Sequence, residues 1–441
     1  MKDHVFYPDL ANEYPVIERG KGLYLWDTNG KKYIDACCGA LVSHIGHGVE
    51  EIREAAYAQL KEVEFAHRFK FSSNSLVKLA ELLISIAPKD FDKAMFISGG
   101  SEATESAMKM AREYFVEKGK PTKYKIISRW QSYHGNTLGA LSVSGNTGRR
   151  RRFAPMLLDF PHTEPAYCYR CPFAKEPDNC KLECAQVVEK TIMREGSENV
   201  AAFILEPIAG STIGAAVPKD GYMQMIREIC DRHDVLLIAD EVMTGVGRTG
   251  INFAVDHWGV VPDMICMAKG LSGGYTALGA VAVKKQVYEA FEQGSKKFAH
   301  GFTYGSNPVS AATGLAVLSY IINNGLIENS RIMGEKLMQR LEALKGKYEF
   351  IGDVRGRGLM TGIEFVKDRA TKETFAASEN ITNNIIKTAL DEGLMLYAAA
   401  ACADGFKGDA VMIAPPLNVT DAELDEIMTL FEKVLKKVFK G

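Results

Sequence analysis

The sequence predicts an α/β protein built around a mainly parallel β-sheet that is flanked by helices. Residues from about 62 to 320 alternate short apolar runs with amphipathic stretches, a pattern typical of repeated strand–helix units. Two of the runs, 235–239 and 264–268, are apolar throughout and are bounded by turn residues. Continuous apolar runs of this length are typical of parallel strands buried on both faces, so these two predict the centre of the sheet.

An aspartate and a lysine directly follow these two predicted strands. Asp240 ends the first run, and Lys269 ends the second run 29 residues later, each before a glycine-rich segment. Ligands of open parallel sheets bind outside the carboxyl ends of the strands, so we expect both residues in one site. A converging carboxylate and amine suit pyridoxal 5′-phosphate (PLP), because the amine binds the cofactor and the carboxylate keeps its pyridine nitrogen protonated. Taken alone, the pair also fits a surface salt bridge.

Three further motifs favour a cofactor site. The small-residue turn Ser98–Thr104 opens a predicted helix, Glu102–Phe115, and its free N–H groups suit a phosphate. Tyr133 follows a predicted strand over 125–128 and offers a ring that can stack on the pyridine. Thr303 supplies a hydroxyl in a glycine-containing loop. Each motif also fits ordinary packing, but together with Asp240 and Lys269 they are hard to attribute to packing.

The order of these motifs resembles that of the class III aminotransferases, which are PLP-dependent enzymes of fold type I. The residues that carry the resemblance are Gly100-Ser101, Tyr133-His134-Gly135, Glu206-Pro207, Asp240-Glu241-Val242, Lys269 and Thr303. The resemblance begins at Gly22–Asp35 and ends at Ala414–Leu417. Within the family, the chain is most similar to the ω-aminotransferases, which act on amines, β-amino acids and related substrates.

The resemblance implies a role for each of these residues. Lys269 would hold the cofactor and move the substrate proton, and Asp240 would keep the ring nitrogen protonated. The other implied cofactor residues are Gly100, Ser101 and Thr303 at the phosphate, Tyr133 and Val242 on the two ring faces, Glu206 beside the cofactor O3′, and His134.

The resemblance also implies the domain organisation and the assembly. A large PLP-binding domain is expected over residues 62–320. The N-terminal segment 1–61 would join the C-terminal segment 321–441 in a smaller α+β domain. A homodimer or a dimer of dimers is expected, with Thr303 reaching the phosphate in the neighbouring subunit.

Departures from the family pattern bear on the substrate. Many members have an arginine after the aromatic-His-Gly motif and another before the Ala-Pro-Pro-like segment, where this chain has Asn136 and the apolar run 411–413. Since arginine is the usual carboxylate partner, this argues against a dicarboxylate or ornithine-like donor. Arg68 and His67 are candidates for a substrate anion site, with Lys407 as the alternative cation, and a surface-facing pair is the competing interpretation for 67–68.

The predicted activity is therefore transfer of an amino group from an ω-amine or β-amino compound to a keto acid such as pyruvate or 2-oxoglutarate. Three alternatives stay open at this point. The donor could be a β-aminoacyl thioester, the enzyme could be a PLP-dependent lyase or aminomutase of the same fold, or the chain could be a catalytically inactive homologue.

The composition excludes several other classes of protein. The 441 residues are 46% hydrophobic and 24% charged, which is ordinary for a globular protein. A net charge of −2 gives no reason to expect nucleic acid or an anionic membrane as partner. The sequence shows no signal peptide and no apolar run near the roughly 18 residues of a membrane span, so a cytoplasmic location is expected.

Two further clusters carry weaker predictions. Four cysteines fall in one insertion, at positions 168, 171, 180 and 184. Their spacing matches no strong metal motif, so no metal is predicted, although thiolate pairs of this kind are chemically able to bind one. The basic run Arg149–Arg152 is interpreted as a solvated face or a set of interface salt bridges, with phosphate or coenzyme A binding as the alternative.

Overall fold

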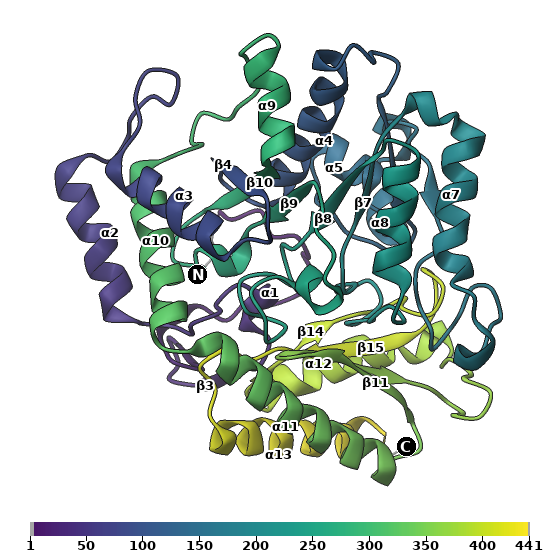
Figure 1. The fold of residues 1–441 in the computed structure, drawn as a ribbon. Helices are drawn as coiled ribbons and strands as arrows, with labels where there is room; N and C mark the ends of the chain where they lie inside the picture. The colour runs from purple at the N-terminus through teal and green to yellow at the C-terminus, as the bar shows by residue number, and fades with distance from the viewer. Residues whose placement is uncertain (1–3, 440–441) are drawn as a thin grey trace.

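A seven-stranded sheet forms the centre of the protein (Figure 1). The computed structural model describes residues 4–439. The strand order is β4-β10-β9-β8-β7-β5-β6. Strand pairs from β9 to β6 are parallel, whereas β10 is antiparallel to both of its neighbours. The strands are β4 (Phe91–Ile97), β5 (Lys125–Arg129), β6 (His162–Thr163), β7 (Val200–Leu205), β8 (Leu236–Asp240), β9 (Met264–Met267) and β10 (Gly279–Lys284).

Apolar side chains fill both faces of this sheet, as the continuous apolar runs predict. In β8, Leu236 and Ile238 belong to the core on one face, and Leu237 and Ala239 to the core on the other. One face packs against α4 (Gly100–Glu117) and α9 (Lys285–Gln293). The other packs against α7 (Glu183–Glu195), α8 (Tyr222–Arg232), α3 (Asn74–Ile86) and α10 (Pro308–Asn323). The predicted fold class is confirmed.

Local sequence signals fix several helix starts. The Ser73 hydroxyl accepts from the N–H of Leu76 and caps α3. Asn307 caps α10 and is followed by a proline at the first helical position, where a missing N–H costs nothing. α10 packs against α3 and α2 (Glu50–Glu62), which lie together on the left in Figure 1.

No single helix among residues 4–439 is long and apolar enough to cross a membrane. The pair α10 and α11 (Leu326–Lys347) passes together by length and composition, but it is bent by 62°. Much of α10 is buried against the helices and sheet of this same chain.

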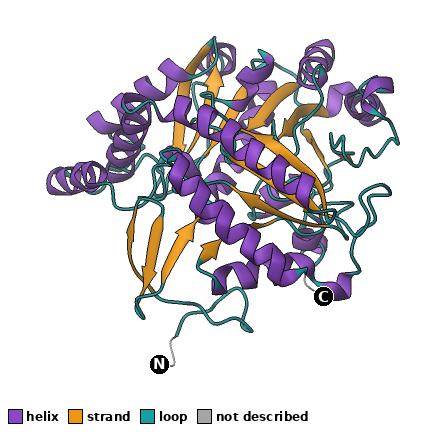
Figure 2. Ribbon diagram, turned by 90° about the horizontal axis from the view of Figure 1, so that it is seen from below, coloured by secondary structure: helices purple, strands orange, loops and turns teal. Residues whose placement is uncertain are grey.

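Segments from the N-terminal and C-terminal parts of the chain share a second layer. This layer lies below the large sheet in Figure 1 and toward the viewer in Figure 2. A four-stranded sheet joins β1 (Ile17–Lys21), β2 (Tyr24–Asp27) and β3 (Lys32–Asp35) to β13 (Leu394–Met395), and β3 pairs in parallel with β13. Another contains β11 (Ile351–Arg357), β12 (Met360–Phe365), β15 (Asp409–Ile413) and β14 (Tyr397–Ala398). Helices α11, α12 (Ile381–Asp391) and α13 (Asp421–Val438) pack on these strands and on one another.

The remaining elements are short. They are α1 (Cys38–Leu41), α5 (Leu138–Val143), α6 (Thr147–Arg150) and the 3-10 turns η1 (Ala154–Met156), η2 (Pro177–Asn179), η3 (Ser197–Asn199), η4 (Ala254–Trp258), η5 (Lys269–Leu271) and η6 (Ala377–Glu379).

Candidate active site

A cavity of about 150 Å³ opens where the strands of the large sheet end. Asp240 is the last residue of β8, and Lys269 follows β9, its parallel neighbour, so both side chains enter this cavity. All the predicted cofactor residues except Thr303 line it. They are Gly100, Ser101, Tyr133, His134, Glu206, Asp240, Val242 and Lys269.

Lys269 lies in a strained backbone conformation at the centre of this group. Its φ of 46° falls in the left-handed region, which an L-residue with a long side chain rarely adopts. Such strain typically costs about 1–3 kcal/mol and is kept where the surrounding structure holds it. Burial lowers the pKa of the Lys269 amine to about 8; the charges of Asp240 and Glu206 oppose the shift, and those of Arg149 and Arg248 add to it. Neutral amine is therefore available near neutral pH, as nucleophilic and proton-transfer chemistry requires.

Asp240 is held in place by two neighbours. Its Oδ2 lies 2.7 Å from His134 Nδ1, and its Oδ1 accepts the N–H of Val242 at 3.1 Å. Asp240 is only 4% exposed. The other ring nitrogen of His134, Nε2, is buried without a partner among the described residues. A buried carboxylate fixed in this way is suited to hold a proton on a ring nitrogen placed in the cavity.

Glu206 forms a second buried carboxylate beside this group. Its Oε1 accepts the N–H of Gly210 at 3.0 Å, and its Oε2 accepts the N–H of Tyr133 at 3.3 Å. Burial raises the pKa of Glu206, while the positive charges near it act in the opposite direction. This hydrogen bond holds the backbone of Tyr133 next to the Glu206 carboxylate.

The first turn of α4 provides a seat for a phosphate. The helix begins after Gly99, and no side chain caps its first turn. Its first N–H groups are therefore available to an anion in the cavity. Ser101 lies in this turn, and its Oγ accepts the N–H of Asn136 at 3.1 Å. A Cβ at Gly135 would lie 2.5 Å from Ser101 Oγ, so only glycine lets the His-Gly segment approach the turn this closely.

These groups match the chemistry of PLP. The uncapped turn with a serine hydroxyl suits the phosphate, the buried carboxylate suits the pyridinium, and the amine of depressed pKa suits the aldehyde. Tyr133 and Val242 line the same cavity and supply surfaces for the ring. The residues present therefore fit the cofactor.

Thr303 and the candidate anion residues lie elsewhere in this chain. Thr303 is exposed and does not line the cavity around Lys269. Arg68 donates from Nη2 to the carbonyl of His300 at 2.9 Å and packs beneath the loop that carries Thr303. His67 is exposed with its ring against Phe69. None of the three lines the cavity around Lys269 in this chain.

Lys407 and the cysteines are grouped at a different surface. Lys407 lines a cleft with Cys168 and Cys171, outside the cavity around Lys269. Among residues 4–439, no group of three or more His, Cys, Asp or Glu side chains is arranged to hold a metal ion.

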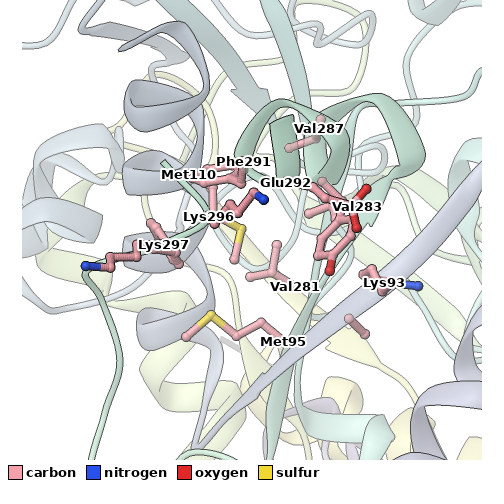
Figure 3. Close-up of a pocket in the computed structure, with 13 residues that line it drawn as sticks. Lys93, Met95, Met110, Val281, Val283, Val287, Phe291, Glu292, Lys296 and Lys297 are labelled. Carbon is pink, nitrogen blue, oxygen red and sulfur yellow. The ribbon is translucent and has the colours of Figure 1, made fainter. Parts of the chain in front are cut away.

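A larger, mainly apolar cavity of about 590 Å³ lies beside β4, the strand at one edge of the sheet (Figure 3). It is formed by β4, β10, α4 and α9, with Met95, Val281, Val283 and Phe291 on its walls. Lys297 lies at the edge of this group in Figure 3, whereas Lys296 lies near Phe291 and Glu292. It shares no lining residue with the cavity around Lys269, so its size does not make it part of the reaction site.

Taken together, the fold and the cavity define a PLP-dependent transferase of fold type I. Comparison with known proteins then identifies the family, because the family model described as "Aminotransferase class-III" matches residues 8–435. The chain belongs to the class III aminotransferases, uses PLP, and transfers amino groups to keto acids.

Individual relatives cover the whole chain. It is 41% identical over all 441 residues to the uncharacterized aminotransferase YodT of Bacillus subtilis, covering 99% of that protein. It is 34% identical to the putrescine–pyruvate aminotransferase of Pseudomonas aeruginosa, covering 95% of this chain and 90% of the relative. A solved (S)-enantioselective ω-transaminase from Thermomicrobium roseum superposes with a TM-score of 0.92 at 35% identity, over 99% of this chain and 96% of that one.

One functional candidate escaped the sequence analysis. The guanidinium of Arg149 lies 5.0 Å from the centre of the Tyr133 ring, and its charge contributes to lowering the pKa of Lys269. The interpretation of 149–152 as a solvated face or a set of interface salt bridges stays a prediction, and within this run Arg149 lies over the Tyr133 ring. Asn146 caps the short helix α6 by accepting the N–H of Arg149. This capping residue is the sequence signal that the arginine run begins in a helix.

Proposed function

We propose that this enzyme takes its amino group from an ω-amine or a β-amino compound and passes it to a keto acid such as pyruvate or 2-oxoglutarate. The observation that carries the proposal is the single cavity that contains Asp240, Glu206, Tyr133 and Lys269. Two relatives support the substrate class, since one is named for putrescine and pyruvate and a solved one as an ω-transaminase.

The absence of the two usual arginines supports a donor without a second carboxylate. Asn136 is exposed and uses its N–H for Ser101, and the run 411–413 is buried inside β15. Neither position offers a cation to a substrate.

The proposed residue roles follow from the side-chain chemistry. When bound, PLP supplies an electron sink for the bond that breaks at the substrate carbon. Lys269 Nζ holds the cofactor and then moves a proton at the substrate carbon. The Asp240 carboxylate keeps the ring nitrogen protonated, and His134 orients Asp240. Gly100 and Ser101 bind the phosphate, and Tyr133 and Val242 hold the ring between them.

A screen of donors against acceptors tests the activity. β-Alanine, taurine, a β-aminoacyl thioester and butylamine would each be incubated with the holoenzyme and either pyruvate or 2-oxoglutarate, and the carbonyl product measured. We expect turnover with at least one amine and one keto acid. With donor alone, an aminotransferase releases one carbonyl product per active site and stops. Continued release without acceptor identifies a lyase and contradicts the proposal.

We also propose a homodimer in which Thr303 completes the phosphate site of the neighbouring subunit. Thr303 is exposed beside Tyr304, and the exposed rings of Phe65 and Phe69 lie on the adjoining segment. Exposed aromatic residues in one region are typical of an interface. The boundaries at 62 and 320 and the cytoplasmic location stay predictions of the sequence.

Subunit mixing tests whether Thr303 acts in the neighbour's site. Lys269→Ala and Thr303→Ala subunits would be mixed and re-associated at limiting PLP. If Thr303 acts across the interface, each mixed dimer contains one site with both native residues, and activity rises above that of either parent. No recovery in mixed dimers, verified by distinct affinity tags, would place Thr303 in its own subunit's site or outside the site.

A further inference from the structure

Arg149 presents a guanidinium without an acidic partner beside Tyr133, a residue that lines the cavity. It lies 5.0 Å from the centre of the Tyr133 ring, on the short helix α6. The side chain is exposed, and no carboxylate among residues 4–439 is within salt-bridge distance of it. A guanidinium resting on an aromatic face keeps its N–H edge available to an anion.

The position of Arg149 follows from its neighbours in the run. Arg150 donates from Nη1 to the carbonyls of Leu141, Ser142 and Ser144 at 2.7–2.8 Å, which fixes α6 against the preceding segment. Asn146 caps the same helix by accepting the N–H of Arg149 at 3.0 Å. The next two arginines, 151 and 152, are exposed. The run thus contains one anchored arginine and one that lies over Tyr133.

A loop of the C-terminal segment lies against α6, the short helix that carries Arg149. A Cβ at Gly405 would lie 3.0 Å from Thr147 Oγ1, so the small-residue loop 397–405 lies against α6. Gln131 donates from Nε2 to the carbonyl of Cys402 at 2.9 Å and ties this loop to the segment before Tyr133.

The other cations near the cavity are already bound to protein groups. Arg248 donates from Nη1 to the carbonyls of Leu359 and Pro415, and it is fully buried. Arg129 donates from Nη2 to the carbonyl of Glu206 at 2.6 Å. Neither can turn toward a substrate without leaving a buried carbonyl unpaired, which is costly.

We propose that Arg149 binds the carboxylate next to the carbonyl carbon, which pyruvate and 2-oxoglutarate share, and so selects keto acids as acceptors. This assignment rests on the proposed function, because it assumes a keto acid acceptor. The planar guanidinium pairs with a carboxylate through two parallel hydrogen bonds. Tyr133, over whose ring the guanidinium lies, lines the cavity that contains Lys269. A donor amine without a carboxylate gains nothing from this contact.

The test compares Arg149→Gln with Arg151→Gln, an exposed neighbour in the same run that serves as the matched control. The acceptor KM is measured for pyruvate and for 2-oxoglutarate with butylamine as donor. The half-reaction with butylamine alone is measured separately. A third measurement, independent of turnover, is the Kd of glutarate for the holoenzyme by calorimetry, since glutarate has carboxylates but no carbonyl that could accept an amino group.

We expect the acceptor KM of Arg149→Gln to rise about 10- to 150-fold for both keto acids, the range for loss of a charge-assisted hydrogen bond. Glutarate affinity should fall in the same range. The butylamine half-reaction, measured at pH 9, above the pKa of Lys269, should change by less than about threefold. Arg149→Lys should recover part of the loss, because it restores the charge without the planar fork. Arg151→Gln should match the wild type.

Several results would overturn the assignment. One is an unchanged KM for both acceptors; another is an increase confined to 2-oxoglutarate, which would indicate its distal carboxylate. An equal loss in the butylamine half-reaction would indicate a general defect in the site. If Arg68→Gln raises the KM and Arg149→Gln does not, the anion site belongs to Arg68 of a neighbouring subunit. Failure of the proposed function is distinct, because the wild type itself would then transfer no amino group to either keto acid.

Discussion

The depressed pKa of Lys269 predicts how fast the apoenzyme binds its cofactor at each pH. Covalent attachment requires the neutral amine. With a pKa of about 8, about a quarter of Lys269 is neutral at pH 7.5, against about one in a thousand for a lysine at the ordinary 10.5. Below pH 8 the attachment rate should fall about tenfold per pH unit, and above pH 8 it should level off. Burial of the amine is the main cause, so the effect belongs to the folded site.

The assay mixes apoenzyme with PLP between pH 7 and 10 and follows the absorbance of the bound cofactor. Glu206→Gln should move the inflection to lower pH, because that carboxylate raises the pKa of Lys269. Arg149→Gln should move it to higher pH, because that guanidinium lowers the pKa. Arg151→Gln should leave it in place. A rate that still rises about tenfold per pH unit up to pH 10, or shifts of the same sign in the first two variants, would refute the reasoning.

Three further predictions concern the same site. Lys269→Ala should abolish turnover while circular dichroism stays native, and retention of a tenth of the activity would show that another group does its work. Asp240→Asn should still bind cofactor but slow the single-turnover rate by orders of magnitude, because a neutral amide cannot hold the pyridinium proton; a near-normal rate would contradict this. Gly135→Ala should weaken cofactor affinity about tenfold or more, because its φ is 137° and the new Cβ would lie 2.5 Å from Ser101 Oγ. Gly346→Ala, whose Cβ meets open space, is the control, and equal affinities would remove the steric argument.

Much of the cavity could be predicted from the sequence because its residues directly follow regular elements. Asp240 and Lys269 follow apolar runs whose length and lack of alternation indicate buried parallel strands, and the structure has β8 and β9 there. The predicted helix Glu102–Phe115 is observed as α4, extended by two residues at each end. Elements of this kind depend on local patterns, which a single sequence contains.

Arg149 could not be predicted, because its position depends on contacts made by other residues. Nothing in four consecutive arginines indicates which one faces the cavity. The direction is fixed by Arg150, whose guanidinium is anchored on three backbone carbonyls of the segment around α5. Thr303 shows a second reason why sequence-based prediction fails: its proposed role requires a subunit interface, and the sequence of one chain does not describe that interface. The same holds for Arg68 if it acts in a neighbouring subunit. The pairing of β10 antiparallel to its neighbours is a third feature that local patterns left unspecified.

The parallel pairing of β3 with β13 has a consequence for synthesis of the chain. Ile34 pairs with Leu394, so the strand made near the beginning acquires its partner only after almost the entire chain has been made. At about 5–20 residues per second, the ribosome needs roughly 20–70 s to make the chain between them. During that time β1, β2 and β3 can form a hairpin-like sheet, but its outer edge stays open to other strands. Newly made chains should therefore depend on chaperones until their last helix is released, and shortening the C-terminus should expose the same edge permanently.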